Sequence, residues 1–138
     1  MNIKYHLKNI IKSREHLPLY KPNKLSKPEN IIEIENYSSA WKGIELIIED
    51  VLNRFKTGRK SCIEFGVEFG YSAVVFSNYF EKVLGIDTFA CDVHTGTRIN
   101  HFESTQKRLS AFPNIQLIKS DYKDWISEDN NYYDFAHV

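Results

Sequence analysis

Short apolar runs alternate with amphipathic stretches over residues 38–138 of this 138-residue chain. The expected strands cover residues 61–65, 82–86, 115–120 and 132–138. The expected helices cover residues 38–56, 71–80 and 95–112, with one further helical turn at 122–126. Such alternation predicts an α/β, Rossmann-like fold: a three-layer sandwich with a mainly parallel sheet of about four strands.

Capping residues predict where the helices begin and end. Ser38 or Ser39 is expected to be the N-cap of the helix at 38–56, and Gly58 lies just past its end. Pro113 is expected to stop the helix at 95–112.

Charge divides the chain into a basic N-terminal extension with a linker (1–37) and a domain (38–138). The first 28 residues carry seven Lys or Arg and a single acid, although the net charge of the whole chain is zero. The extension is interpreted as a solvated arm, or as a contact for an acidic or phosphorylated partner. A nucleic-acid partner is not indicated, because the arm has few aromatic residues for stacking.

Cysteine use and hydropathy predict the compartment. Cys62 lies in an expected buried strand, and with Cys91 it forms no paired framework. Both thiols are therefore expected to be reduced, as in a cytoplasmic protein. No apolar run approaches the roughly 18 residues of a membrane span, so no membrane partner is expected.

The segment IEFGVEFGYSA (63–73) joins the first strand to the next helix through a loop with two glycines. Gly66 and Gly70 allow the backbone to approach a ligand closely, and the helix that follows offers free N–H groups. The loop also carries Glu64 and Glu68, two carboxylates that would repel a pyrophosphate. The G-x-x-x-G spacing also differs from the dinucleotide fingerprint. A cationic or zwitterionic ligand is expected.

Two further strands also end in acids. Asp87 ends the second strand, where a carboxylate can accept both hydroxyls of a ribose. Asp121, followed by Tyr122, ends the third strand and is placed to accept from the amine of a base. Parallel strands bring these ends to one edge of the sheet. A methionine-like end near Glu64, a ribose at Asp87 and an adenine near Asp121 describe S-adenosylmethionine.

Structural roles for the same residues stay open. Glu64 could cap the next helix, and Gly66 and Gly70 could serve turn geometry alone. Asp87 could begin a loop without contacting a ligand, and Asp121 could cap the turn that follows it.

The motifs IEFGVEFGYSA, VLGIDTF, IQLIKSDYKDW and YYDFAHV resemble those of class I S-adenosylmethionine-dependent methyltransferases. The pattern E-F-G-V-x-x-G-x-S resembles the macrocin-type branch, which methylates oxygens of small molecules and sugars. The resemblance covers residues 38–138. It implies that Glu64, Gly66 and Gly70 cradle the methionine part of the cofactor. It places the ribose at Asp87 and the adenine beside Asp121 and Tyr122.

The resemblance also implies parts beyond this sequence. Relatives have seven strands and continue past DFAHV with acids or a histidine, and metal-dependent members bind a divalent cation such as Mg²⁺ there. This chain would then carry the cofactor-binding half, with the small-molecule acceptor held elsewhere. Its open fourth-strand edge could pair with a second copy as a homodimer.

The loop at 87–101 is polar and long for a strand-to-helix connection. His94 could act as a general base or hold an acceptor, or it could be an exposed histidine. Cys91, His94 and His101 match no standard zinc spacing, so no metal ligand is assigned.

Two rival functions remain. One is a binding module that holds S-adenosylmethionine, or no ligand at all, without catalysis. The other is a nucleotide or NAD-binding domain of an oxidoreductase, against which the acidic loop and the glycine spacing count.

Overall fold

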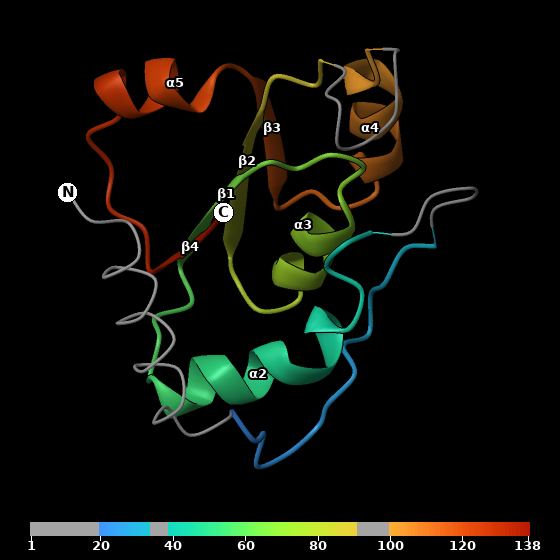
Figure 1. Cartoon of the computed structure of the whole chain (residues 1–138), viewed down its shortest axis with the longest axis vertical. Coiled ribbons are helices and arrows are strands. Elements are labelled where there is room, and N and C mark those ends of the chain that lie inside the picture. The colour runs from blue at the N-terminus through green and yellow to red at the C-terminus, as the bar shows by residue number, and fades with distance from the viewer. Residues whose placement is uncertain (1–19, 34–38, 91–99) are drawn as a thin grey trace, which may run out of the picture.

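Four parallel strands form one sheet in the computed structural model of this chain, which describes residues 20–33, 39–90 and 100–138 (Figure 1). The strands are β1 (Ser61–Phe65), β2 (Lys82–Asp87), β3 (Ile115–Lys119) and β4 (Phe135–His137). The helices are α2 (Ile44–Arg54), α3 (Tyr71–Ser77), α4 (Phe102–Leu109) and α5 (Tyr122–Glu128). The α/β class and the parallel sheet predicted from the alternation are confirmed.

The order in which the chain adds strands to the sheet reverses beside β1. The order across the sheet is β3-β2-β1-β4, so the chain moves outward from β1 to β3 and then returns to the other side of β1. In the pairing of β1 with β4, Glu64 lies opposite His137. The carboxyl ends of β1 and β4 therefore lie side by side where the strand order reverses, which is where open α/β sheets bind ligands.

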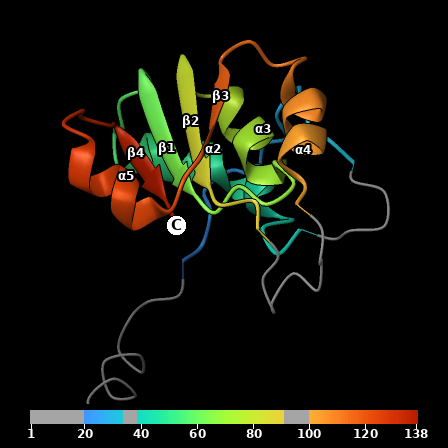
Figure 2. The same cartoon turned by 90° about the horizontal axis from the view of Figure 1, so that it is seen from above.

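Helices cover both faces of the sheet (Figure 2). Cys62 and Val83 face the larger core together with α3, which contributes Val74 and Phe76. The opposite face carries a smaller core of Ile63, Leu84 and Ile86, against which partly buried side chains of α5 and its neighbours pack. Side chains alternate between faces along a strand, so neighbouring β1 residues enter different cores.

The structure corrects the expected boundaries of the first helix. α2 begins at Ile44, after Gly43 in the left-handed region at φ 111°, and neither Ser38 nor Ser39 is its N-cap. Its last turn closes at Lys56, whose φ is 52°. The Lys56 N–H donates to the Asn53 carbonyl and the Thr57 N–H to the Leu52 carbonyl, a Schellman arrangement. The helix thus ends before Gly58 because Lys56 takes the left-handed position.

Other boundaries are also shorter than expected. α3 ends at Ser77 rather than at 80, and β4 covers only 135–137. α4 begins at Phe102, and the stretch 91–99 of the expected helix lies outside the described residues. α5 extends the single expected turn to Glu128.

The segment at 20–33 forms neither helix nor strand, as expected of a linker, and it is attached to the helices. The Tyr20 hydroxyl donates to the Asp50 carboxylate at 2.6 Å. Asn30 and Asn78 exchange two hydrogen bonds, each of 2.9 Å. These contacts anchor the segment to α2 and to the end of α3.

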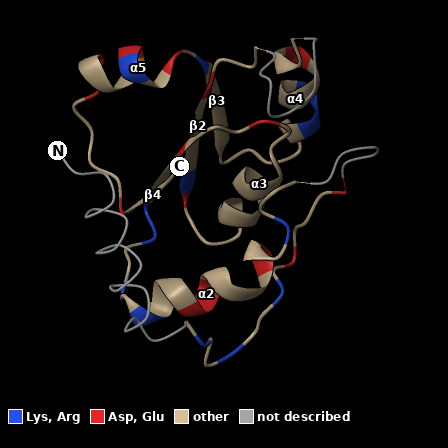
Figure 3. Cartoon of the chain, in the orientation of Figure 1, with Lys and Arg blue, Asp and Glu red and all other residues tan. Residues whose placement is uncertain are grey.

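Basic residues gather at the C-terminal end of α2 and in the segment before it, away from α5 (Figure 3). Within the described ranges, no helix has the length and apolar character needed to cross a membrane.

Candidate functional site

A pocket lies at the carboxyl edge of the sheet, as the strand order predicts. Its volume is about 420 Å³. Its walls are Phe65, Gly66, Ile86, Asp87, Thr88, Ser120, Tyr122, Ile126 and Val138. None of these residues is Lys or Arg, and most of the surface is apolar. The pocket suits a flat, uncharged ring system better than an anionic group.

Gly66 and Gly70 play different parts in the loop after β1. Both have left-handed φ values, 89° and 87° respectively. A Cβ on Gly66 would meet no atom within 4 Å, whereas one on Gly70 would lie 2.7 Å from Leu109 Cδ1. Gly66 therefore leaves open space for a ligand beside the backbone. Gly70 allows α3 to begin close against α4, which is the structural role left open above.

Asp87 lines the pocket and also fixes the two loops beside it. Its Oδ2 accepts from the Glu68 N–H at 2.8 Å, and its Oδ1 accepts from the Phe89 N–H at 2.7 Å. Glu68 and Phe89 both have left-handed φ values near 50°, which the carboxylate helps to hold. Each oxygen retains a second lone pair that a ribose hydroxyl could use.

Asp121 and Tyr122 have different roles in the structure. Asp121 is the N-cap of α5, because its side chain accepts from the Lys123 N–H at 2.8 Å, and it is not among the pocket walls. Tyr122 does line the pocket, is 51% exposed, and packs edge-to-face on Phe65 with ring centroids 6.5 Å apart. The described structure thus favours Tyr122, rather than Asp121, for contact with a ring.

Glu64 does not line the pocket. Its side chain is fully buried on the α3 side of β1, and its Oε1 lies 3.0 Å from His137 Nδ1. Burial raises the pKa of Glu64, while the His137 ring and the Ser72 hydroxyl oppose that rise. Glu64 Oε2 and His137 Nε2 are both buried and have no hydrogen-bond partner among the described residues.

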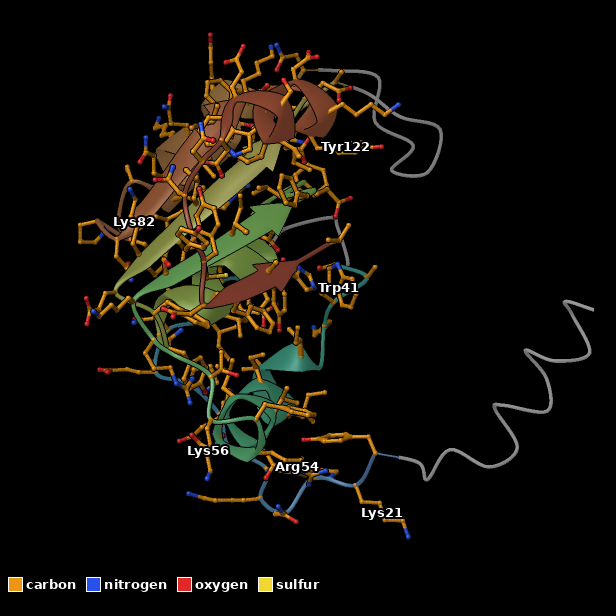
Figure 4. All side chains as sticks on the ribbon, turned by 90° about the vertical axis from the view of Figure 1, so that its left-hand side faces the viewer. Lys21, Trp41, Arg54, Lys56, Lys82 and Tyr122 are labelled. Carbon is orange, nitrogen blue, oxygen red and sulfur yellow. The ribbon has the colours of Figure 1, made fainter. Side chains whose placement is uncertain are left out.

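Aromatic rings enclose the imidazole of His137. The Trp41 ring lies 4.3 Å from it and the Phe76 ring 4.9 Å, both edge-to-face. Trp41 precedes α2 and lies beside the tip of β4, on the side where the strands end (Figure 4). The buried pair is therefore separated from solvent by a half-exposed tryptophan.

A second, smaller pocket of about 60 Å³ is separated from this pair by Trp41 and Ser72. Its walls are Ser39, Ala40, Trp41, Gly66, Val67, Glu68, Phe69, Tyr71 and Ser72. Gly66 lines both pockets. Trp41 and Ser72 are walls of the small pocket that also act on His137 and Glu64. One ligand could therefore pass over Gly66, with a ring at one end and a small polar group at the other.

The other candidate residues from the sequence contribute less to the site. His94 and Cys91 lie outside the described residues. His101 stands just before α4 and packs on the Phe69 ring at 4.8 Å, as expected of a structural histidine. Cys62 is a buried free thiol, and burial raises its pKa. Over the described ranges, no three His, Cys, Asp or Glu side chains are arranged to hold a metal ion.

Sequence reasoning missed His137, Trp41 and Ser72. His137 was available in principle, since it ends a strand that a parallel fold can place beside β1. The contact of Trp41 with His137 depends on the path of the chain before α2, and no sequence pattern indicates that path. Comparison of the chain with protein-family models and with curated proteins finds no significant match.

Proposed function

We propose that this chain is the cofactor-binding part of an S-adenosylmethionine-dependent methyltransferase that acts on an oxygen of a small molecule. The observation that carries the proposal is the pair of pockets that meet at Gly66. One suits an adenosine, and the other has Trp41 and Ser72 as walls, behind which the buried imidazole and carboxylate lie. When bound, the cofactor supplies an electrophilic methyl group. The residues of this chain would hold and orient it.

Each part of an adenosine with a charged tail finds a partner of suitable chemistry. The adenine would lie in the apolar pocket against Tyr122 and Ile126, and Asp87 would accept from the ribose hydroxyls. The open space at Gly66 lets the chain of the ligand cross the loop. Its ammonium-bearing end would enter the small pocket above Glu64. A dinucleotide is less suitable, because its pyrophosphate would meet Glu68 and Asp87 where no Lys or Arg lines either pocket.

Calorimetric titration with S-adenosylhomocysteine tests the proposal, and we expect a micromolar Kd for the whole chain. Tyr122→Ala should weaken binding about tenfold, since stacking of a base on an aromatic ring contributes roughly 1–3 kcal/mol. Tyr132→Ala is the matched control, because Tyr132 is 96% exposed and lines neither pocket. It should bind as the wild type does.

The alternatives give different results. Absence of binding by a chain that circular dichroism shows to be folded would contradict the proposal. Displacement by NAD at similar concentration would favour the dinucleotide function. Binding without methyl transfer to any oxygen acceptor would favour a non-catalytic module.

A further inference from the structure

The contact between Glu64 and His137 joins two strands at the carboxyl edge of the sheet. The two residues are register neighbours on β1 and β4, and their side chains meet at 3.0 Å. The carboxylate is fully buried, and the imidazole side chain is 9% exposed. A buried carboxylate is costly unless it is hydrogen-bonded, so this contact decides how Glu64 is held.

The hydrogen bond also determines what the two remaining polar atoms can do. When Glu64 is ionised, its Oε1 accepts from His137, so the ring proton lies on Nδ1. Glu64 Oε2 is then an acceptor without a donor among the described residues. In the neutral ring, His137 Nε2 is a second such acceptor. Two buried acceptors on one hydrogen-bonded pair indicate a ligand group that carries N–H donors.

The surroundings of the pair narrow the chemistry of that group. Burial, His137, Ser72 and Asp87 are the main influences on Glu64, and none of these partners is Lys or Arg. Trp41 and Phe76 fix the imidazole plane from two sides. Among these partners, only the imidazole of His137 can carry a positive charge next to the carboxylate. A primary ammonium group would complete it.

We propose that His137 is a positioning residue that holds Glu64 so that the carboxylate, behind the Ser72 wall of the small pocket, receives the ammonium group of the ligand together with the Ser72 hydroxyl. This inference rests on the proposed function. Ser72 is 2% exposed, lies in the first turn of α3 and lines the small pocket. Its hydroxyl can donate to Glu64 and accept from an ammonium group at the same time. Trp41 closes the pocket on the His137 side.

Two ligands separate this role from a purely structural one. S-adenosylhomocysteine carries the ammonium group, whereas 5′-methylthioadenosine has the same adenosine and lacks the amino-acid end. His137→Phe removes the donor and keeps an apolar ring between Trp41 and Phe76. It should weaken binding of S-adenosylhomocysteine about 10- to 100-fold, the range of one hydrogen bond to a charged group. Binding of 5′-methylthioadenosine should change less than about twofold.

A conservative variant and a second receptor residue complete the test. The amide of His137→Asn can still donate toward Glu64 and should recover most of the lost affinity for S-adenosylhomocysteine. Ser72→Ala deletes one hydroxyl without disturbing β4, and it should also weaken S-adenosylhomocysteine selectively. These two variants decide the matter if His137→Phe does not fold.

The outcomes distinguish this inference from the proposed function. Equal weakening of both ligands in His137→Phe, or unchanged affinity for S-adenosylhomocysteine in Ser72→Ala, would overturn the positioning role and leave the cofactor site in place. The same holds if the wild type binds S-adenosylhomocysteine no more tightly than 5′-methylthioadenosine. Failure of the wild type to bind either ligand would overturn both proposals.

Discussion

At the scale of single residues, the burial of Glu64 makes the stability of the fold depend on pH. Burial raises its pKa, so the native state binds this proton more readily than the unfolded chain does. The favourable contribution of Glu64 is therefore present at low pH and is lost as the pH rises through the native pKa. A buried acid retained at such a cost is typical of a functional site.

Glu64→Gln should make the protein more stable, by about 1 kcal/mol at pH 8. The amide oxygen can still accept from His137 Nδ1, and no buried charge remains. The gain should shrink toward pH 4, where the wild-type carboxyl is itself protonated. Urea denaturation midpoints at the two pH values measure it, with the exposed Glu81→Gln as the control. A loss of stability at pH 8 would mean that the charged pair with His137 is net stabilising.

The directions of side chains explain how far the site could be predicted from the sequence. The strand-end acids do lie along one edge, as parallel topology requires. Glu64 nevertheless turns into the core under α3, because it shares a face of β1 with Cys62. Asp121 serves as a helix cap. Position along a strand predicts the edge, while the identity of the partner depends on the three-dimensional packing.

At the scale of elements, substitutions of Gly66 and Gly70 distinguish the cost of backbone strain from the cost of a packing clash. Gly70→Ala should cost about 2–4 kcal/mol, because it combines a left-handed alanine with a clash against Leu109. Gly66→Ala has nearly the same φ and open space, so it should cost only about 1–2 kcal/mol. Thermal unfolding of the two variants compares them directly. Equal losses would show that α4 moves away without cost.

Element types were predictable because periodicity and apolar content are local properties of the chain. The residues at which the helices begin and end were less predictable. α2 starts after a left-handed Gly43 and ends at Arg54, two residues before a left-handed Lys56, whereas Ser39 and Gly58 were the better local candidates for these positions. Contacts such as Trp41 with His137 decide these ends, and they involve residues far away in sequence.

At the scale of the whole molecule, Asp50 connects the segment at 20–33 to α2. Its carboxylate accepts from the Tyr20 hydroxyl, the Asn23 N–H and Arg54, whose guanidinium also lies over the Tyr20 ring. The hydrogen bond from Tyr20 is the main cause that lowers the pKa of Asp50. The attachment is therefore complete above the ordinary carboxyl pKa and is lost as the pH falls through the lowered one.

Asp50→Ala should release this segment while the sheet stays folded. Hydrogen exchange should show faster exchange at the Asn23 amide, with protection in α3 and β1 unchanged. Glu49→Ala removes the same charge from the neighbouring position of α2 and should leave Asn23 protected. Unchanged exchange at Asn23 in Asp50→Ala would show that the other contacts of the segment, such as those of Asn30, Ile31 and Ile32, hold it without Asp50.

The pairing of Glu64 with His137 has a consequence for synthesis of the protein. The two residues are 73 positions apart in the chain. At about 5–20 residues per second, the ribosome adds the histidine about 4–15 s after the glutamate. During that interval β1 can pair with β2, and β2 with β3, yet the buried carboxylate of β1 lacks its imidazole. The nascent sheet should therefore stay loosely closed around β1 until β4 arrives, and a binding-competent site becomes available only at that step.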